Sequence, residues 1–520
     1  MDKVVQSNRR SVVPVGLLAI VVAYGIALCI GWPQSGTQQI VESLHHAEGA
    51  TTETVSGEGS NGIAAPPFWT VLPFVLLLAG IAVLPLIPHT SHWWESNLNR
   101  FKVAGGLALL TMAYYAFLHG AALEGHWPAH HVVAPTEGGV QTGLVNTILA
   151  NAMLQEFVPF IVLLFSLYTI SGGTRIAGDF AARPTTNAIF MGVGSVLASF
   201  IGTTGAAMLL VRPLLETNRE RKYVAHTVVF FIFVACNCGG CLLPIGDPPL
   251  FLGYLEGVPF LWTLRLWPEW LFVNGLLIVA YLLLDGLWFH RRESKADVQR
   301  DVQRTHRLKI AGWKVNAPLL LGVVLAVALL DPGKPFPGTD WHPWMYLREI
   351  VQLCLVGMSL WIGDHKIRDA NLFTYGAIIE VAALFVGIFV CMQPALQILA
   401  IKGGELGLTT PAHFFWASGS LSSVLDNAPT YLVFFKTAQS MAGHAGVTPV
   451  AGVNPLILAA ISLGSVFMGA MTYIGNGPNF MVRSIAESSG VKMPSFFGYM
   501  IYSCLILLPI LALTVWRFLM

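Results

Sequence analysis

A polar stretch at residues 422–430 interrupts an otherwise apolar part of the chain. It contains Asp426, Asn427 and a proline, and it lies between the apolar runs 412–421 and 431–435. Proline lacks a backbone donor and opposes a continuous helix, and a charged side chain at membrane depth costs at least about 2.5–3.5 kcal/mol. Irregular polar backbone is tolerated at that depth only where it is buried in protein or lines a watery cavity. The stretch therefore favours an ion or substrate site, and a polar surface loop between two short helices is the alternative.

The composition indicates that these residues belong to a membrane protein. The 520 residues are 55% hydrophobic and 11% charged, whereas soluble domains carry about 25% charged residues. Apolar runs of near 20 residues match the thickness of a lipid bilayer. The formal net charge of +1 does not suggest nucleic-acid binding. We therefore expect an all-α, multi-pass protein of the inner (plasma) membrane.

The polar interruptions occur in both halves of the chain, at offsets of 223–229 residues. Three landmark pairs show this spacing: Glu156 with Glu380, Thr204 with Asn427, and Ile245 with Ile474. Basic residues flank the first interrupted hairpin on both sides, whereas the flanks of the second, 401–411 and 440–454, hold one Lys between them. The positive-inside rule therefore places the two hairpins on opposite sides of the membrane. Two repeats of inverted topology are typical of secondary transporters that work by alternating access.

These patterns predict about eleven membrane crossings and two re-entrant hairpins, with the N-terminus in the cytoplasm and the C-terminus outside. Residues 32–66 contain no Lys or Arg, which favours a flexible external loop. The predicted division is an N-terminal membrane helix and external loop (1–67), a first repeat (68–290) with hairpin 187–217 and broken helix 223–256, a basic cytoplasmic linker (291–311), and a second repeat (312–520) with hairpin 412–440 and broken helix 455–485.

Each half brings a hairpin tip next to a broken helix, and both features expose backbone groups. Carbonyl and side-chain oxygens suit a hard cation such as Na⁺, whereas free N–H groups at a helix start suit an anion such as a carboxylate. In the first half the candidate cation ligands are Thr203, Thr204, Asn237, Gly246 and Asp247. In the second half they are Ser423, Asp426, Asn427, Thr430, Gly475 and Asn476. For each glycine, a simple helix kink is the alternative.

Proton coupling requires a carboxyl group that exchanges protons away from bulk water, because burial penalises the charged form. Asp247 and Asp426 are the preferred candidates, and Glu156 and Glu380 are further ones. For either glutamate, a position at an interface turn is the alternative. Arg212 is a candidate for binding a substrate anion, or its side chain reaches the cytoplasmic face. No cofactor is expected, since Na⁺ and H⁺ would be transported ligands.

Four motifs together resemble the ion transporter superfamily. This group includes arsenite permeases, NhaD-type sodium/proton antiporters, citrate–metal transporters and divalent-anion/sodium symporters. The resemblance covers roughly residues 68–516 and is strongest to the citrate transport and sodium:proton antiporter members. The motifs are Thr204-Gly205-Ala206-Ala207, Asp426-Asn427-Ala428-Pro429-Thr430, Pro244-Ile245-Gly246-Asp247-Pro248-Pro249 and Ile474-Gly475-Asn476-Gly477-Pro478-Asn479.

The resemblance implies a homodimer with a scaffold built from the early spans of each repeat and a moving transport domain. It also implies Na⁺ sites at the two hairpin tips, which map here to Thr203, Thr204, Ser423, Asp426 and Asn427. The acidic second tip and Asp247 favour exchange of Na⁺ or Li⁺ for H⁺. We therefore expect a secondary transporter, first a sodium(lithium)/proton antiporter and alternatively a Na⁺- or H⁺-coupled carrier of citrate or another small organic anion. An enzyme is not expected.

Overall fold

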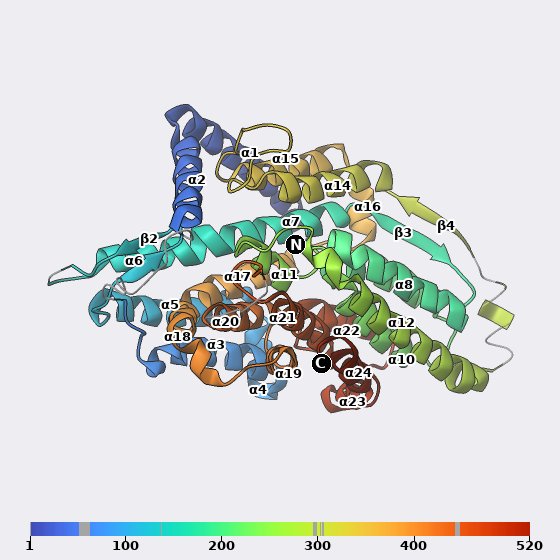
Figure 1. Ribbon diagram of the computed structural model, residues 1–520. Coiled ribbons are helices and arrows are strands. Elements are labelled where there is room, and N and C mark those ends of the chain that lie inside the picture. The colour runs from blue at the N-terminus through green and yellow to red at the C-terminus, as the bar shows by residue number, and fades with distance from the viewer. Residues whose placement is uncertain are drawn as a thin grey trace. The chain divides into compact units, whose positions relative to one another are not determined.

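The computed structural model is helical almost throughout the residues that it describes (Figure 1). The described residues are 2–50, 63–136, 138–294, 299–301, 303, 306–441 and 448–520. Part of the predicted external loop (51–62) and part of the predicted basic linker (295–298, 302, 304 and 305) lie outside them.

Several helices have the length and apolar composition of membrane spans. Among the described residues, five helices have this length and composition, and a sixth candidate is a helix pair, Gly376–Cys391 with Gln393–Leu406, that is broken between its two parts. These helices support the prediction of an all-helical, multi-pass membrane protein. The five are Val13–Ile30, Thr142–Ser171, Pro184–Ile201, Trp262–Arg292 and Phe496–Phe518.

The chain forms two compact units, each assembled from separate stretches. Unit 1 comprises Met1–Pro73, Arg100–Gly173 and Gly312–Gln393, and unit 2 comprises Phe74–Asn99, Thr174–Ala311 and Pro394–Met520. Each unit therefore takes segments from both halves of the sequence, so the units do not coincide with the predicted repeats.

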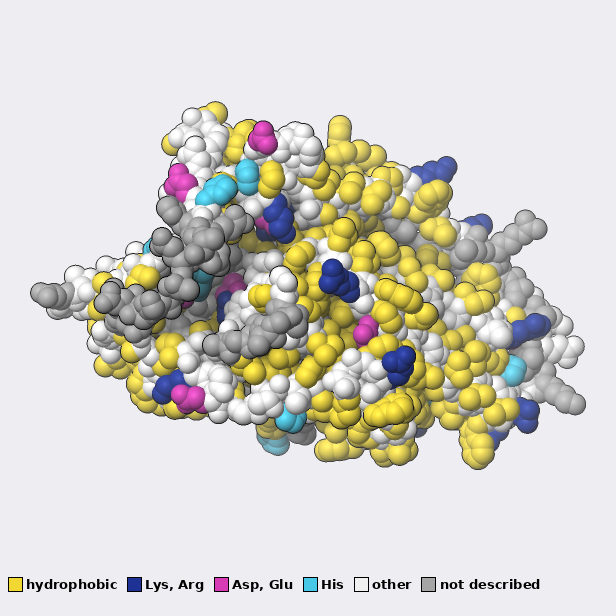
Figure 2. All heavy atoms as spheres, in the orientation of Figure 1, with side chains coloured by type: hydrophobic (Ala, Val, Ile, Leu, Met, Phe, Trp, Pro, Cys, Tyr) yellow, Lys and Arg dark blue, Asp and Glu magenta, His cyan; other side chains and the backbone are white. Residues whose placement is uncertain are grey.

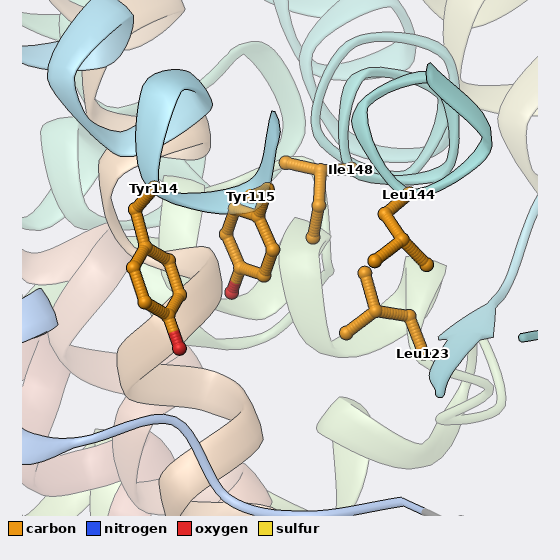
Figure 3. Close-up of a cluster of buried hydrophobic side chains, with 5 residues drawn as sticks. All are labelled: Tyr114, Tyr115, Leu123, Leu144 and Ile148. Carbon is orange, nitrogen blue, oxygen red and sulfur yellow. The ribbon is translucent and has the colours of Figure 1, made fainter. Parts of the chain in front are cut away.

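Unit 1 is a helical assembly with one short antiparallel ladder. A buried apolar cluster joins Tyr114 and Tyr115 at the end of α5, Leu123 of β1, and Leu144 and Ile148 of α6 (Figure 3). The elements are α1 (Asp2–Ile30), α2 (Trp32–Ala50), η1 (Phe68–Val71), α5 (Asn97–Phe117), β1 (Leu123–Gly125), β2 (His131–Val133), α6 (Thr142–Leu149), η3 (Ala150–Phe157), α7 (Val158–Ser171), α14 (Trp313–Leu329), α15 (Leu347–Ile362), α16 (His365–Ala370) and α17 (Gly376–Cys391).

Helix α2 corrects the prediction that residues 32–66 form a flexible loop. The Thr37 hydroxyl in α2 donates to the Pro343 carbonyl (3.2 Å) and accepts from the Met345 N–H (2.8 Å). In the same helix, Gly36 lies directly against the Met345 side chain. These contacts hold residues 32–50 as a helix. The polar composition did not reveal them, because the partners are about 300 residues away.

Unit 2 contains both predicted hairpins and both predicted broken helices. Its elements are α3 (Leu72–Val83, of which the first two residues belong to unit 1), η2 (Leu84–Leu86), α4 (Pro88–Trp94), β3 (Arg175–Asp179), α8 (Pro184–Ile201), α9 (Thr203–Thr217), α10 (Ala225–Ala235), η4 (Cys238–Cys241), α11 (Pro248–Leu255), η5 (Trp262–Leu266), α12 (Trp267–Leu284), η6 (Asp285–Phe289), η7 (His290–Arg292), β4 (His306–Ala311), α18 (Gln393–Lys402), η8 (Gly403–Leu406), α19 (Pro411–Ser422), α20 (Asn427–Gln439), α21 (Pro455–Met468), η9 (Gly469–Met471), α22 (Gly477–Ser488), α23 (Phe496–Tyr502), η10 (Ser503–Leu507) and α24 (Leu508–Phe518).

The hairpins and broken helices of unit 2 pack closely because small residues lie between them. Helix α19 packs along α21, where Gly464 faces the Phe415 carbonyl and Gly419 faces the Met468 side chain. Glycine at such positions lets helix backbones approach, as in other membrane helix pairs. Hairpin α8–α9 turns at Gly202, whose φ of +77° favours a residue without a side chain.

A buried ionic cluster fixes the end of α12 to the start of α10. Asp285 accepts hydrogen bonds from Arg221 (3.0 and 2.5 Å), from Tyr281 (2.9 Å) and from His226 (3.0 Å), and its side chain is fully buried. A buried carboxylate is tolerated only when it is paired and hydrogen-bonded in this way. The cluster therefore holds the first part of the broken helix in place.

The described part of the basic linker returns to the first hairpin. Strand β4 pairs antiparallel with β3, and the Asp301 carboxylate accepts a hydrogen bond from the Ala182 N–H (2.8 Å), just before α8.

Hydrophobic side chains cover much of the surface drawn in Figure 2, including the part over α23 and α24. Leu505 and Trp516 there are about 70% exposed. Large exposed apolar surface of this kind is expected where helices face lipid.

Candidate functional site

Four helices of unit 2 begin around one buried carboxylate, that of Asp247. Asp247 itself precedes α11, Gly202 precedes α9, Asp426 precedes α20 and Asn476 precedes α22. Two of these helices belong to the hairpins and two to the broken helices. Helix starts carry unpaired N–H groups and partial positive charge.

The Asp247 carboxylate accepts hydrogen bonds from three other elements. Oδ1 accepts from the Thr203 hydroxyl of α9 (3.3 Å) and from the Asn476 amide at α22 (3.3 Å), and Oδ2 accepts from the Asn427 amide of α20 (3.0 Å). All four residues are at most 4% exposed. One carboxylate thus connects both hairpin tips to both broken helices.

Two further asparagines extend this network, and sequence reasoning named only one of them as a site residue. The Asn476 amide also donates to Asn237 (3.2 Å), and the Asn237 amide donates to Asn479 (2.8 Å). Asn479 in turn donates to the carbonyls of Gly469 (2.8 Å) and Thr472 (3.0 Å). The available signal for Asn479 was an amide that directly follows the Gly-Pro break of the second broken helix.

Glycines allow the broken helices to approach the hairpin tips. A side chain at Gly246 would collide with the Gly240 carbonyl, and one at Gly475 would lie 2.6 Å from the Gly469 carbonyl and 2.8 Å from that of Ser422. Each pair is six residues apart. The same contact therefore recurs in the two halves, and the Gly246 carbonyl accepts from the Thr203 N–H (2.9 Å).

The remaining predicted residues of the tips make local hydrogen bonds. Asp426 accepts from the Ala428 N–H (3.1 Å) and so caps α20, and Thr430 donates to the Asp426 carbonyl (3.0 Å). Ser423 donates to the Ser420 carbonyl (2.7 Å), and Thr204 is half-buried in the first turn of α9. These hydrogen bonds serve the helix ends and do not reach Asp247.

The two glutamates predicted to couple protons belong to unit 1, whereas Asp247 belongs to unit 2. Glu380 forms an ion pair with Arg100 (2.8 Å), and Glu156 accepts from Gln393 (3.4 Å). Arg212 is half-buried on α9, nine residues beyond Thr203. Within the described ranges, Arg212 forms no ion pair with a carboxylate.

The donors around Asp247 define what this site can bind. Two amide groups and a hydroxyl converge on one carboxylate, which is an arrangement that favours an anion. The positive ends of four helices also favour an anion. The negative charges of Asp247 and Asp426 offset part of this effect. The side-chain oxygens of Asp247, Asn237 and Asn427 are ligands that would suit Na⁺. In the part of the chain that the structure describes, no group of three or more His, Cys, Asp or Glu side chains is placed to hold a metal ion.

Comparison with known proteins finds a matching family, a curated relative and a similar solved structure. A family model described as "Putative citrate transport" matches residues 63–519. The P protein of Sus scrofa is 24% identical over 257 residues, and this match spans 45% of the present chain but only 30% of the P protein. The structure of MtrF from Neisseria gonorrhoeae, which represents a class of antimetabolite efflux pumps, aligns with a TM-score of 0.42 at 13% identity, covering 85% of this chain and 97% of MtrF.

Proposed function

Because the chain belongs to the citrate transport family whose model it matches over residues 63–519, we propose that it carries citrate or a similar small carboxylate across the membrane, coupled to Na⁺ or H⁺. Membership of this family makes the protein a transporter and not an enzyme.

The observation that carries the substrate proposal is the convergence of donors at Asp247. Asn427, Asn476 and Thr203 direct N–H and O–H groups at one point, and that point already holds a carboxylate. A site that binds one carboxylate through amide and hydroxyl donors offers the same donors to a substrate carboxylate. We place the substrate between the hairpin tips and the broken helices.

This proposal reverses the order of the two functions expected from sequence. The antiporter prediction relied on Asp247 and Asp426 as cation or proton carriers. Asp247 accepts hydrogen bonds from neighbouring side chains, and Asp426 accepts one from the backbone as the cap of α20. Both carboxylates therefore already have protein donors and are not reserved for binding a cation. Together with the family, these contacts support carboxylate transport better than Na⁺/H⁺ antiport.

The transport mechanism that we propose is alternating access by two inverted repeats. Unit 2, which contains the hairpins and broken helices, would act as the transport domain, and unit 1 would act as the scaffold of a homodimer. The recurring glycine contacts at Gly246 and Gly475 support a repeat relationship. Inverted repeats exchange their arrangements and so open a central site to alternate sides.

A liposome assay tests the function directly. Purified protein is reconstituted in liposomes that contain a pH-sensitive dye, and a proton gradient is imposed across their membrane. Na⁺, Li⁺, K⁺ or citrate is then added outside. We expect saturable citrate uptake that is accompanied by Na⁺ or H⁺, that falls at least tenfold in Asn427→Ala, and that is unchanged in Gln299→Ala, an exposed amide of the linker. Dissipation of a proton gradient by Na⁺ or Li⁺ without citrate would instead establish antiport.

A further inference from the structure

The hydrogen bonds of Asp247 impose a condition on the substrate, provided that the site proposed above is correct. In the structure its carboxylate receives the Thr203 hydroxyl and the Asn427 and Asn476 amides, and only 1% of the residue is exposed. A substrate carboxylate that takes over these donors must remove them from Asp247. A buried carboxylate deprived of its donors is strongly unfavourable.

The neighbouring side chains supply no obvious replacement donor. The amide of Asn237 already donates to Asn479 and to the Ile232 carbonyl, and the amide of Asn479 donates to the Gly469 and Thr472 carbonyls. Asn476 also has other acceptors, since its amide donates to the Cys236 carbonyl (3.1 Å) and to Asn237 (3.2 Å) as well as to Asp247 (3.3 Å). None of these side chains offers Asp247 a new donor, so that donor comes from a backbone N–H at a helix start, from water or from the ligand.

We propose that this transporter selects hydroxycarboxylates, because the substrate hydroxyl donates to Asp247 while the substrate carboxylate accepts from Asn427 and Asn476. Such a ligand returns one hydrogen bond to Asp247 for the two amide bonds that it removes, and the Thr203 hydroxyl still donates to Asp247. A carboxylate without a hydroxyl takes the same donors and gives Asp247 nothing in return. Asp247 is then the residue that determines specificity, and the two asparagines bind the carboxylate.

The acceptor Asp247 and the donor Asn476 occupy matched positions in the two halves of the site. Asp247 and Asn476 have nearly the same backbone, with φ and ψ of −142° and 142° against −153° and 139°, and each precedes the second part of a broken helix. At these matched positions one half presents an acceptor and the other an amide donor. A ligand complementary to both needs one acceptor group and one donor group on adjacent carbons, which a 2-hydroxycarboxylate such as citrate or malate provides.

Matched ligands test this inference without altering the protein. Citrate and tricarballylate carry the same three carboxylates and differ by one hydroxyl, and malate and succinate form a second such pair. Initial uptake rates are measured in liposomes at about pH 8, where all these carboxyl groups are ionised. We expect kcat/KM to be about ten- to hundredfold higher for the hydroxyl-bearing member of each pair that is transported, as expected when a buried polar group is left unpaired.

The variant Asp247→Asn links the preference to this residue. Its amide can itself turn a donor toward a ligand, so we expect the ratio between citrate and tricarballylate to fall below about threefold. As a control, Glu487→Gln, an exposed carboxylate on α22, should keep the wild-type ratio. Size-exclusion chromatography of each variant establishes that it is folded. If Asp247→Asn does not fold, the kcat/KM ratios of the wild-type protein alone decide whether the hydroxyl is preferred.

The outcomes separate this inference from the function on which it depends. Equal transport of citrate and tricarballylate by the wild-type protein, or an undiminished ratio in folded Asp247→Asn, would overturn the hydroxyl preference and leave carboxylate transport intact. Absence of transport for all four carboxylates would overturn the proposed function itself.

Discussion

At the scale of single residues, the candidate site depends on a carboxylate and on two glycines that let backbone approach it. Asp247 is held by side chains that lie 44, 180 and 229 residues away in the sequence. Gly246 and Gly475 occupy matched places, since each would meet a glycine carbonyl six residues before it if it carried a side chain. The absence of a side chain at these two positions is therefore a requirement of packing.

Alanine at Gly246 or Gly475 should disrupt the site, because the added methyl group meets backbone atoms that cannot rotate away. We expect a loss of about 1–3 kcal/mol or more in stability and a loss of citrate uptake. Thermal unfolding of the purified variants and initial uptake rates measure the two effects.

Gly477 provides the matched control for this experiment. It lies two residues beyond Gly475, and no atom lies within 4 Å of a side chain added there. Gly477→Ala should change stability by no more than about 0.5 kcal/mol. If all three variants lose stability and uptake to the same extent, the close backbone contacts at Gly246 and Gly475 are not the cause of the losses.

At the scale of helices, the site is organised by pairing each hairpin with the broken helix of the other half. Helix α11 of the first half packs against α20 of the second, and α9 packs against α22. Along the first pair, Asn427 bonds with Asp247, the Tyr431 hydroxyl lies against Gly253, and Lys436 forms an ion pair with Glu256. These contacts advance together along both helices, so α11 and α20 run parallel from the site.

The ion pair between Lys436 and Glu256 should position Asn427 against Asp247. Both side chains are less than one-fifth exposed, so we expect Lys436→Glu to cost about 1–3 kcal/mol, between the values of exposed and fully buried pairs, and to slow citrate uptake. The double exchange Glu256→Lys with Lys436→Glu should recover most of both losses, and the coupling energy from the double-mutant cycle measures the pair.

A second ion pair serves as the comparison. Arg483 and Glu487 lie one turn apart on α22, and the Glu487 side chain is 44% exposed. Glu487→Lys should therefore have an effect below about 1 kcal/mol. A failure of the double exchange to restore uptake would show that the pair on α11 and α20 acts through something other than its charge.

At the scale of the whole molecule, the sequence is divided twice in different ways. The predicted repeats divide it into consecutive halves. Unit 2 instead collects the hairpins, the broken helices and the last spans of both halves, together with most of α3 and with α4, and unit 1 holds the other early segments of both halves. Such a division is what a transporter needs if one part of each repeat moves and the other stays.

The predicted topology can be tested with single cysteines in a background from which the seven native cysteines have been removed. Ala134→Cys lies in the loop 124–140, which contains no Lys or Arg and which the positive-inside rule therefore predicts to be external. Gln299→Cys lies in the basic linker predicted to be cytoplasmic, and both positions are exposed. A membrane-impermeant maleimide applied to intact cells should label the first, and should label the second only after permeabilisation. Labelling of both in intact cells would contradict the orientation and, with it, the inverted repeats.

The sequence by itself determined the class of protein and the places where its helices break. Composition and apolar runs indicated a helical membrane protein, and Gly, Pro and polar side chains inside those runs located the breaks near Gly202, Asp247, Asp426 and Asn476. These features are local, because a charged or helix-breaking residue within an apolar segment is costly whatever surrounds it. The resemblance to a transporter family rests on the same local features, because its motifs are the short stretches at these breaks.

Only the tertiary structure decided which of these residues meet. It joined Asp247 to Thr203, Asn427 and Asn476, used Asp426 as a helix cap, and placed Glu156 and Glu380 in the other unit. It also made residues 32–50 a helix through contacts with residues about 300 positions away. Partners so distant in the chain are chosen by the packing of whole helices, and residue type and spacing do not determine which side chains that packing brings together.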